Sequence, residues 1–253
     1  MGKIQSVERA LKILEILADY PDGVGVTELS LKLDVAKSTA HRLLNTLSDH
    51  HYVSKDTKTD SYVLGTQILL IANQVQENLS IVEIAKDEII NLSLLTNETV
   101  HLCLFDKDEI VYIDKVESNQ TIRMHSRIGT RSLMHCTGVG KSILAFLDKE
   151  EVEAILSRKG MIVRTNNTIS NLEDMWVELE RISKNGFAID NIENEEGIRC
   201  VAAPIFDHNK RPIAALSISS PSTRVTYDKA YNEFSNYVMQ AARSISQQLG
   251  SKS

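Results

Sequence analysis

Segment 37–49 carries side chains of the kinds that contact DNA. Its helical period divides the segment into an apolar side and a polar side. The apolar residues are Ala40, Leu43, Leu44 and Leu47, and the polar ones are Lys37, Ser38, Thr39, His41, Arg42 and Asn45. A recognition helix places such donors and acceptors, mostly near its N-terminus, against base edges in the major groove. A solvated helix can show the same stripe, so the prediction of DNA binding depends on the neighbouring elements.

Those neighbours follow the order of a winged helix-turn-helix. A helix over 6–19, with Ser6 as its N-cap, precedes a short helix over 28–33 that Thr27 can cap. A turn at 34–36 leads into helix 37–49, and strand-like runs at 52–54 and 62–64 flank a polar connection. This succession within about sixty-five residues predicts a winged helix-turn-helix over 1–65, with Lys58 at the wing tip as a further DNA contact.

Helix 6–19 is apolar on two sides. We expect one row to be buried and the other to join two DNA-binding domains across a two-fold axis. The row expected to be buried is Val7, Leu11, Leu14 and Ala18, and the second row is Ile13, Ile16 and Tyr20.

Charge limits how strongly one copy of the chain can bind DNA. The net charge is −6, and residues 1–65 hold eight Lys and Arg against nine Asp and Glu. Few phosphate contacts per chain are therefore expected, so useful affinity requires a homodimer.

The remaining sequence predicts a connecting helix over 66–80 and a second domain over 81–253. Strands are expected at 98–105, 110–116, 121–126, 187–190, 200–206 and 213–219. Helices are expected at 82–95, 138–147, 150–157, 171–185 and 226–248. Short turns between strands indicate a largely antiparallel sheet, so the predicted fold class is α+β.

Other chemistries find little support in the sequence. Segment 138–142 (GVGKS) imitates the end of a phosphate-binding loop, but His135 occupies the position of its first glycine. The Gly-rich turn instead opens a helix, either to offer N–H groups to a ligand carboxylate or simply to pack closely. The histidines and cysteines lack metal-ligand spacing, and no nucleophile elbow is present. We therefore expect no catalytic residue, metal or cofactor.

Several segments, in order, resemble the isocitrate lyase regulator (IclR) family of transcriptional regulators. They are 6–14, 37–44, 52–54 with 62–65, 111–117, 123–129, 135–141, 186–190, 197–204 and 216–219. The resemblance implies a GAF-like ligand domain after the winged helix-turn-helix, and operator DNA bound by dimers or dimer pairs. One departure is Ala36, where the family often has Pro.

The resemblance also implies a ligand pocket and a mode of action. Carried over by motif, the pocket residues are Thr121, Met124, Ser132, Gly138, Val139, Asp190, Ile198, Cys200, Ser217 and Ser219. Their hydroxyls, single carboxylate and apolar wall suit a small hydroxylated organic acid. The segments 112–115 and 123–129 are most similar to the branch that senses 2-keto-3-deoxygluconate or related sugar acids. We expect a cytoplasmic repressor with no membrane partner. The alternative is an enzyme that acts on a small acid and uses its N-terminal domain only to dimerise.

Overall fold

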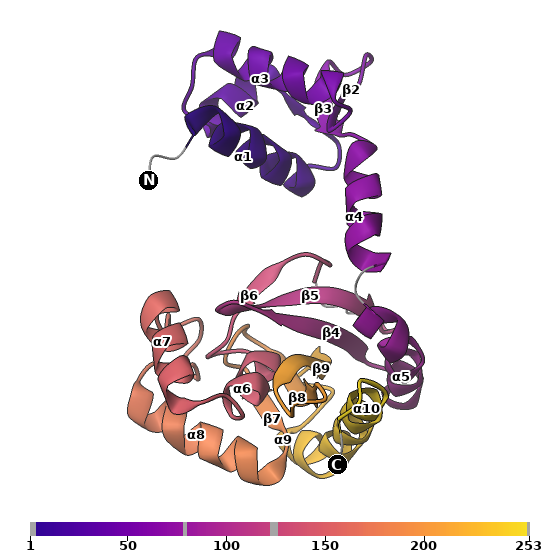
Figure 1. Cartoon of the computed structure of the whole chain (residues 1–253), viewed down its shortest axis with the longest axis vertical. Helices are drawn as coiled ribbons and strands as arrows, with labels where there is room; N and C mark the ends of the chain where they lie inside the picture. Colours follow the sequence, from indigo (N-terminus) through magenta and orange to yellow (C-terminus); the bar gives the residue numbers. More distant parts are fainter. Residues whose placement is uncertain (1–3, 78–79, 122–125, 252–253) are drawn as a thin grey trace. The chain divides into compact units, whose positions relative to one another are not determined.

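The computed structural model describes residues 4–77, 80–121 and 126–251, in two compact units, Met1–Leu79 and Ser80–Ser253 (Figure 1). The first unit contains the elements expected of a winged helix-turn-helix. Its helices are α1 (Gln5–Asp19), α2 (Val26–Lys32) and α3 (Lys37–Asp49). Strands β2 (Val53–Lys55) and β3 (Ser61–Leu64) form the wing, and a short strand β1 (Val24–Gly25) that we did not predict pairs with β3.

The core of this unit corrects our prediction for helix α1. Ile13 is fully buried and Leu17 nearly so, whereas Val7 and Leu11 are 52% and 55% exposed. The buried side of α1 packs against α3 and β3. The row expected to form a dimer contact is therefore partly core, and three of the four residues expected to be buried, Val7, Leu11 and Ala18, are exposed. Helical periodicity reveals two apolar sides but cannot tell which one meets the rest of the domain.

The predicted caps of the first two helices are also wrong. Helix α1 begins after Ile4 and α2 after Gly25, and neither helix has a side-chain cap. Thr27 lies inside α2, where its backbone oxygen accepts a hydrogen bond from the Ser30 hydroxyl. Gly25, the last residue of β1, has an extended backbone, and the helix starts directly after it, two residues before the expected position.

Gly65 turns the chain from β3 into helix α4 (Gln67–Glu77). Its N–H donates to the backbone oxygen of Tyr52, and a Cβ at this position would lie 2.1 Å from the oxygen of His51. Only glycine permits this close approach of two backbones. Helix α4 belongs to the first unit and exposes Leu69, Leu70 and Ile71.

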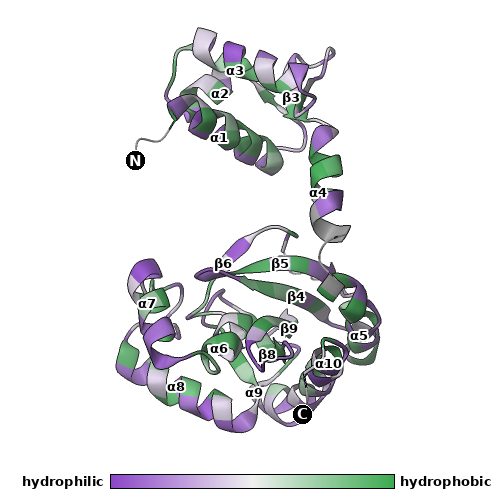
Figure 2. Cartoon of the chain, in the orientation of Figure 1, coloured by the Kyte–Doolittle hydropathy of each residue, from purple (hydrophilic) through white to green (hydrophobic). Residues whose placement is uncertain are grey.

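The second unit is built on one six-stranded antiparallel sheet in the order β6-β5-β4-β9-β8-β7. The strands are β4 (Thr99–Asp106), β5 (Glu109–Val116), β6 (Arg131–Leu133), β7 (Ala188–Asn191), β8 (Ile198–Phe206) and β9 (Pro212–Pro221). The predicted α+β fold with an antiparallel sheet is confirmed. Hydrophobic residues dominate the central strands (Figure 2).

Helices cover both faces of this sheet. Helices α5 (Ser80–Thr96) and α10 (Ser235–Gln248) contact each other and strands β4 and β8. The other face carries α6 (Gly138–Leu144) and, outside it, α8 (Leu172–Asn185), with α7 (Lys149–Lys159) in the same apolar cluster. The predicted final helix, 226–248, is divided into α9 (Tyr227–Lys229), a π-helical turn (Ala230–Phe234) and α10.

The strand expected at 121–126 is not observed at its described ends. Thr121 and Ser126 lie outside strands, and residues 122–125, including Met124, are outside the described residues. The place beside β5 is taken instead by β6, after a turn at 127–130 in which the Gly129 N–H donates to the Tyr112 backbone oxygen. Gly129 has a positive φ of 88°, so this turn depends on glycine.

Candidate functional site

Helix α3 presents its polar residues to solvent, as its sequence pattern predicted. Lys37, Ser38, His41, Arg42 and Asn45 are exposed and Thr39 is half-buried, whereas Ala40 and Leu44 lie in the core. Within the described chain, neither Lys37 nor Arg42 forms a salt bridge. The two cations therefore have no protein carboxylate to release before they meet a phosphate or a base.

The N-terminus of α3 adds further hydrogen-bond donors. Ala36, the N-cap residue, has no side-chain oxygen, so no side chain caps the first turn. Uncapped N–H groups at a helix N-terminus attract phosphate oxygens. On the wing, Lys58 is exposed and unpaired among the described residues, in contrast to Lys55, whose ammonium lies 2.5 Å from Asp60.

In the second unit, strand pairing gathers polar side chains on the sheet face that carries α6. Cys200 pairs with Asp190 on one side and with Ser219 on the other, and Ser217 pairs with His101 of β4. Directly paired residues of antiparallel strands point to the same face. The sheet thus brings together Asp190, Cys200, Ser217 and Ser219, four of the residues that the family resemblance implies. We call this the polar sheet face, and His101 belongs to it.

Gly138 places the start of α6 directly on this face. A Cβ at Gly138 would lie 3.4 Å from the Ala202 Cβ and 3.5 Å from the Asp190 backbone nitrogen. Thr137 caps the helix by accepting a hydrogen bond from the Gly140 N–H. A Cβ at Gly140 would lie 2.3 Å from the Met134 oxygen, so Gly140 is required for backbone packing.

Asp190 is the buried carboxylate of the polar sheet face. Its Oδ1 accepts hydrogen bonds from the N–H groups of Glu193 and Asn194, at 2.7 and 3.3 Å. Burial, reinforced by the charge of Glu193, raises the pKa of Asp190 to about 7 against these hydrogen bonds. Near neutral pH this group therefore changes its charge in response to small changes in its surroundings.

His101 is a residue that the sequence analysis did not place in the pocket. Its Nδ1 lies 3.2 Å from the Ser219 hydroxyl, and its Nε2 lies 2.8 Å from the Ser126 hydroxyl. Burial, with a smaller effect from Lys115, lowers the pKa of His101 to about 4, so the imidazole is neutral at physiological pH. The sequence signal that could have placed His101 on this face is its position in β4, where a polar residue stands within a mostly apolar strand.

The other implied pocket residues have varied positions. Ser132 lies in β6, opposite Ile110 of β5, and Ile198 begins β8 on the same face as Cys200. Val139 is buried in the apolar cluster under α6, which favours a packing role. Thr121 is exposed outside any strand, and Met124 lies outside the described residues.

Lys141, the lysine of the Gly-rich segment, is fully buried and has its own partners. Its Nζ donates to Glu193 Oε1 at 2.6 Å, to Glu178 Oε1 at 2.9 Å and to the Ile189 backbone oxygen at 2.9 Å. Burial lowers the pKa of this ammonium, but the two carboxylates outweigh it and the net direction is upward. A lysine with three protein acceptors and no exposure cannot serve a nucleotide phosphate.

The cysteines of the second unit are poor nucleophiles. Burial raises the pKa of Cys136 to about 12 and raises those of Cys103 and Cys200 further. Thiols this far from ionisation react slowly. Across the residues that the structure describes, no three His, Cys, Asp or Glu side chains are grouped so as to hold a metal ion.

Comparison with known proteins identifies the family. The model of the IclR helix-turn-helix domain matches residues 6–57, and the model of the bacterial transcriptional regulator IclR C-terminal domain matches residues 73–247. The chain belongs to the IclR family. It is thus a DNA-binding transcriptional regulator, and the winged helix-turn-helix and ligand-domain architecture expected from the sequence is confirmed.

Individual relatives are similar to this regulator in sequence over almost its whole length. It is 38% identical over 247 residues to the HTH-type transcriptional regulator KdgR of Dickeya chrysanthemi, spanning 98% of this chain and 80% of that protein. It is 33% identical to the transcriptional repressor IclR of Escherichia coli, over 96% of this chain and 89% of the repressor. The crystal structure of the Thermotoga maritima IclR matches with a TM-score of 0.83 and 38% identity, covering 96% of this chain and 98% of that one. None of the helices in the described part is long and apolar enough to span a membrane.

Proposed function

We propose that this IclR-family regulator is a cytoplasmic repressor whose operator binding is controlled by a small hydroxylated acid such as 2-keto-3-deoxygluconate. Helix α3 and Lys58 contact the operator, and the polar sheet face binds the acid. The observation that carries the second part is the convergence of Asp190, Ser219 and His101 on one buried face next to α6. Relatives described as repressors and the similarity to KdgR support the same reading.

The chemistry of this face matches a sugar acid. The hydroxyls of Ser219, Ser126 and Ser132 and the carboxyl of Asp190 can exchange hydrogen bonds with ligand hydroxyls. The backbone N–H groups at the start of α6 can meet the ligand carboxylate, in a region where Asp190 is close to half-protonated at neutral pH. A protonated Asp190 removes the charge that would repel an anionic ligand.

The same geometry disfavours an enzyme. Ser219 and His101 form a hydroxyl–imidazole pair, but the far nitrogen of His101 meets the Ser126 hydroxyl and, in the described part of the chain, no carboxylate. A histidine with a pKa near 4 is a weak general base at neutral pH. We propose that the second unit binds its acid without converting it, and unchanged acid after long incubation with the protein would agree with this proposal.

Assembly is proposed to involve the exposed side of α1. Val7 and Leu11 line a groove of about 780 Å³ between α1 and α3, which Arg42 and Asn45 also border. A homodimer, or a dimer of dimers, would cover these apolar side chains and supply the second set of phosphate contacts that the low positive charge requires.

The experiment uses full-length protein and operator DNA selected from a random oligonucleotide pool. Adding 2-keto-3-deoxygluconate should change the fraction of operator bound, measured by fluorescence anisotropy at fixed salt. Ser219→Ala should bind operator as the wild type does and respond at least about tenfold less sensitively to the acid, because one buried hydrogen bond is lost. Ser183→Ala, an exposed position of α8, is the matched control. No response to 2-keto-3-deoxygluconate, glyoxylate or pyruvate, or an unaltered response in Ser219→Ala, would contradict the assignment.

A further inference from the structure

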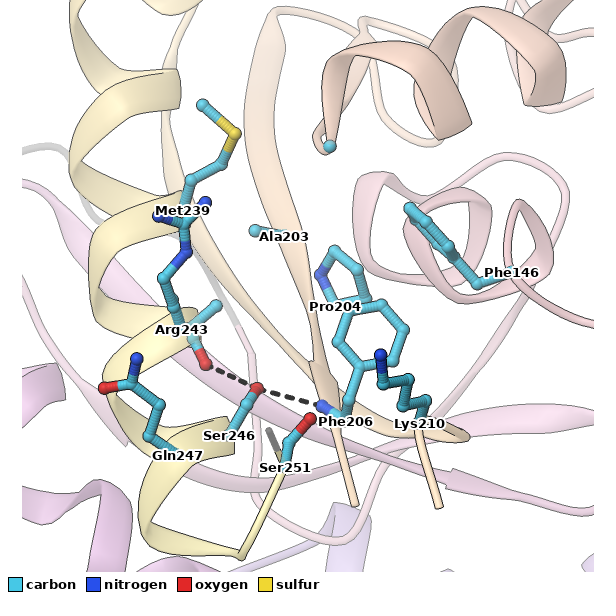
Figure 3. Close-up of a pocket in the computed structure, with 12 residues that line it drawn as sticks. Phe146, Ala203, Pro204, Phe206, Lys210, Met239, Arg243, Ser246, Gln247 and Ser251 are labelled. Atoms are coloured by element: carbon cyan, nitrogen blue, oxygen red, sulfur yellow. Dashed lines mark hydrogen bonds between the residues drawn. The ribbon is translucent and has the colours of Figure 1, made fainter. Parts of the chain in front are cut away.

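A hollow of the second unit lies between α10, the end of β8 and the residues that follow α6 (Figure 3). Its volume is about 580 Å³, and its walls come from β8, α10, the turn after β8 and the residues following α6. Ala203 lines it, whereas Ala202, the preceding residue of β8, lies against Gly138 on the polar sheet face. Among the described residues that line the hollow, none belongs to the polar sheet face, so the hollow is separate from the proposed sugar-acid site.

The walls of this hollow are mainly apolar and aromatic. Phe146 and Phe206 meet edge to face with their ring centroids 5.1 Å apart, and Pro204 and Met239 lie beside them. The Ser246 hydroxyl accepts from the Phe206 N–H at 3.0 Å and donates to the Ala242 oxygen at 2.7 Å. The first of these bonds ties α10 to β8, so the hollow is already formed without a ligand.

Two cations without partners border the apolar walls. Lys210 comes from the turn after β8 and Arg243 from α10, and in the described chain neither forms a salt bridge or a side-chain hydrogen bond. The neighbouring Arg211, by contrast, lies 2.7 Å from Glu151. The described residues that line the hollow include no Asp or Glu. The local charge is therefore positive and uncompensated, although the whole chain is acidic.

We propose that this hollow is a second small-molecule site, which binds monocarboxylates that carry a ring-sized apolar body. The volume falls within the range of about 300–1000 Å³ that ligand sites occupy. The aromatic and methionine walls bury the apolar body, while Arg243 and Lys210 hold the carboxylate at the mouth. A sugar acid, which is polar on all sides, would leave these walls without a matching surface.

The test uses full-length protein with carbon-13-labelled methionine methyl groups. The probe is 3-phenylpropionate, and its matched controls are uncharged 3-phenylpropanol and ring-free propionate. Met239 reports on the hollow, and Met175, fully buried in the apolar cluster on the other side of the sheet, is the internal reference. We expect 3-phenylpropionate to shift the Met239 signal to saturation without moving Met175, with an affinity about tenfold or more above that of either control.

A charge-removing variant assigns the binding to the two cations. Lys210→Gln combined with Arg243→Gln should weaken 3-phenylpropionate binding about tenfold or more, and Lys86→Gln, an exposed unpaired position of α5, should not. An unmoved Met239 signal, equal binding of 3-phenylpropanol, or unchanged affinity in the double variant would overturn the proposal. If the double variant instead alters the sedimentation of the ligand-free protein and the acid does not bind, the hollow is a contact between copies and the proposal is wrong.

Discussion

Two helices of this chain each carry a Lys-Ser pair close to their N-terminus, and the surroundings give the two pairs opposite roles. Lys37 and Ser38 begin α3 on an exposed surface, and Lys37 has no salt-bridge partner among the described residues. Lys141 and Ser142 lie in α6, both completely buried, and Lys141 has three acceptors.

The comparison shows that availability, more than residue type, decides what a cation can do. An exposed ammonium without a partner can bind a phosphate with little reorganisation. A buried ammonium is held by the carboxylates that compensate its desolvation, and it links elements of the fold. Lys141 joins α6 to α8 and to Glu193 in the segment after β7, and the Glu193 N–H in turn donates to Asp190 of β7.

The largest effect is expected from Lys141→Met. This change leaves Glu193 and Glu178 without the buried cation, and removing one partner of such a pair costs about 3–5 kcal/mol. Urea unfolding followed by the fluorescence of Trp176, the only tryptophan and a neighbour of the apolar cluster under α6, measures the loss in the second unit.

Lys37→Met is the matched change at the exposed pair. The free energy of unfolding of the first unit, followed by circular dichroism, should stay within about 0.5 kcal/mol of wild type. If Lys141→Met and Lys37→Met lower the free energy of unfolding by similar amounts, the distinction between a buried, paired lysine and an exposed, unpaired one is wrong.

Asp190 should give the second unit a pH-dependent stability. Its pKa rises from 3.8 in the unfolded chain to about 7 in the fold, so the native state binds the extra proton between these values. The free energy of unfolding must therefore fall as pH rises through this window. Asp190→Asn keeps the Oδ1 acceptor and does not titrate. Relative to wild type it should become more stable by about 2–3 kcal/mol between pH 5 and pH 8.

The check is a set of urea unfolding curves at pH 5, 6, 7 and 8, followed by Trp176 fluorescence. Asp108→Asn is the control, because Arg158 beside this carboxylate lowers its pKa. Parallel pH curves for wild type and Asp190→Asn would show that Asp190 ionises normally in the fold.

The next prediction concerns assembly through α1, which should strengthen the binding of operator DNA. Leu11→Glu places a charge in the exposed apolar row and should lower operator affinity about tenfold to a hundredfold, because two linked reading heads bind more tightly than one. Sedimentation should show a smaller species at the same concentration. Glu15→Gln, at an exposed position of the same helix, should change neither measurement. If Leu11→Glu sediments and binds as wild type does, the α1 surface is not the contact.

Much of the fold could be predicted because its signals are local. Helix α3 begins at Lys37 and ends at Asp49, as predicted. This prediction was possible because the apolar spacing of the helix and the turn before it depend only on neighbouring residues in the sequence. The wing and most strands of the sheet were placed within a few residues for the same reason. The choice between the two apolar sides of α1 depends on packing with α3 and β3, which no local pattern contains.

The site shows the same limit. Ser217 and Ser219 could be placed on one face from strand alternation alone, but their nearness to Asp190 and His101 depends on strand order, which brings β4 and β8 to either side of β9. The partners of Lys141 lie 37 and 52 residues away in sequence, so the Gly-rich segment gave no sign that its lysine is structural. The family motifs pointed to Asp190 and Cys200 as neighbours of the two serines, which residue spacing alone could not do.

The most direct test of the central claim measures how the exposed face of α3 binds operator DNA. Full-length wild type, Arg42→Ala and Ser38→Ala are titrated against the selected operator at one salt concentration. Arg211→Ala in the second unit serves as the charge-matched control for Arg42→Ala. Arg42→Ala should lose about 1–3 kcal/mol of binding free energy, with a smaller loss for Ser38→Ala and none for Arg211→Ala. Operator affinities equal to wild type in both α3 variants would contradict the account.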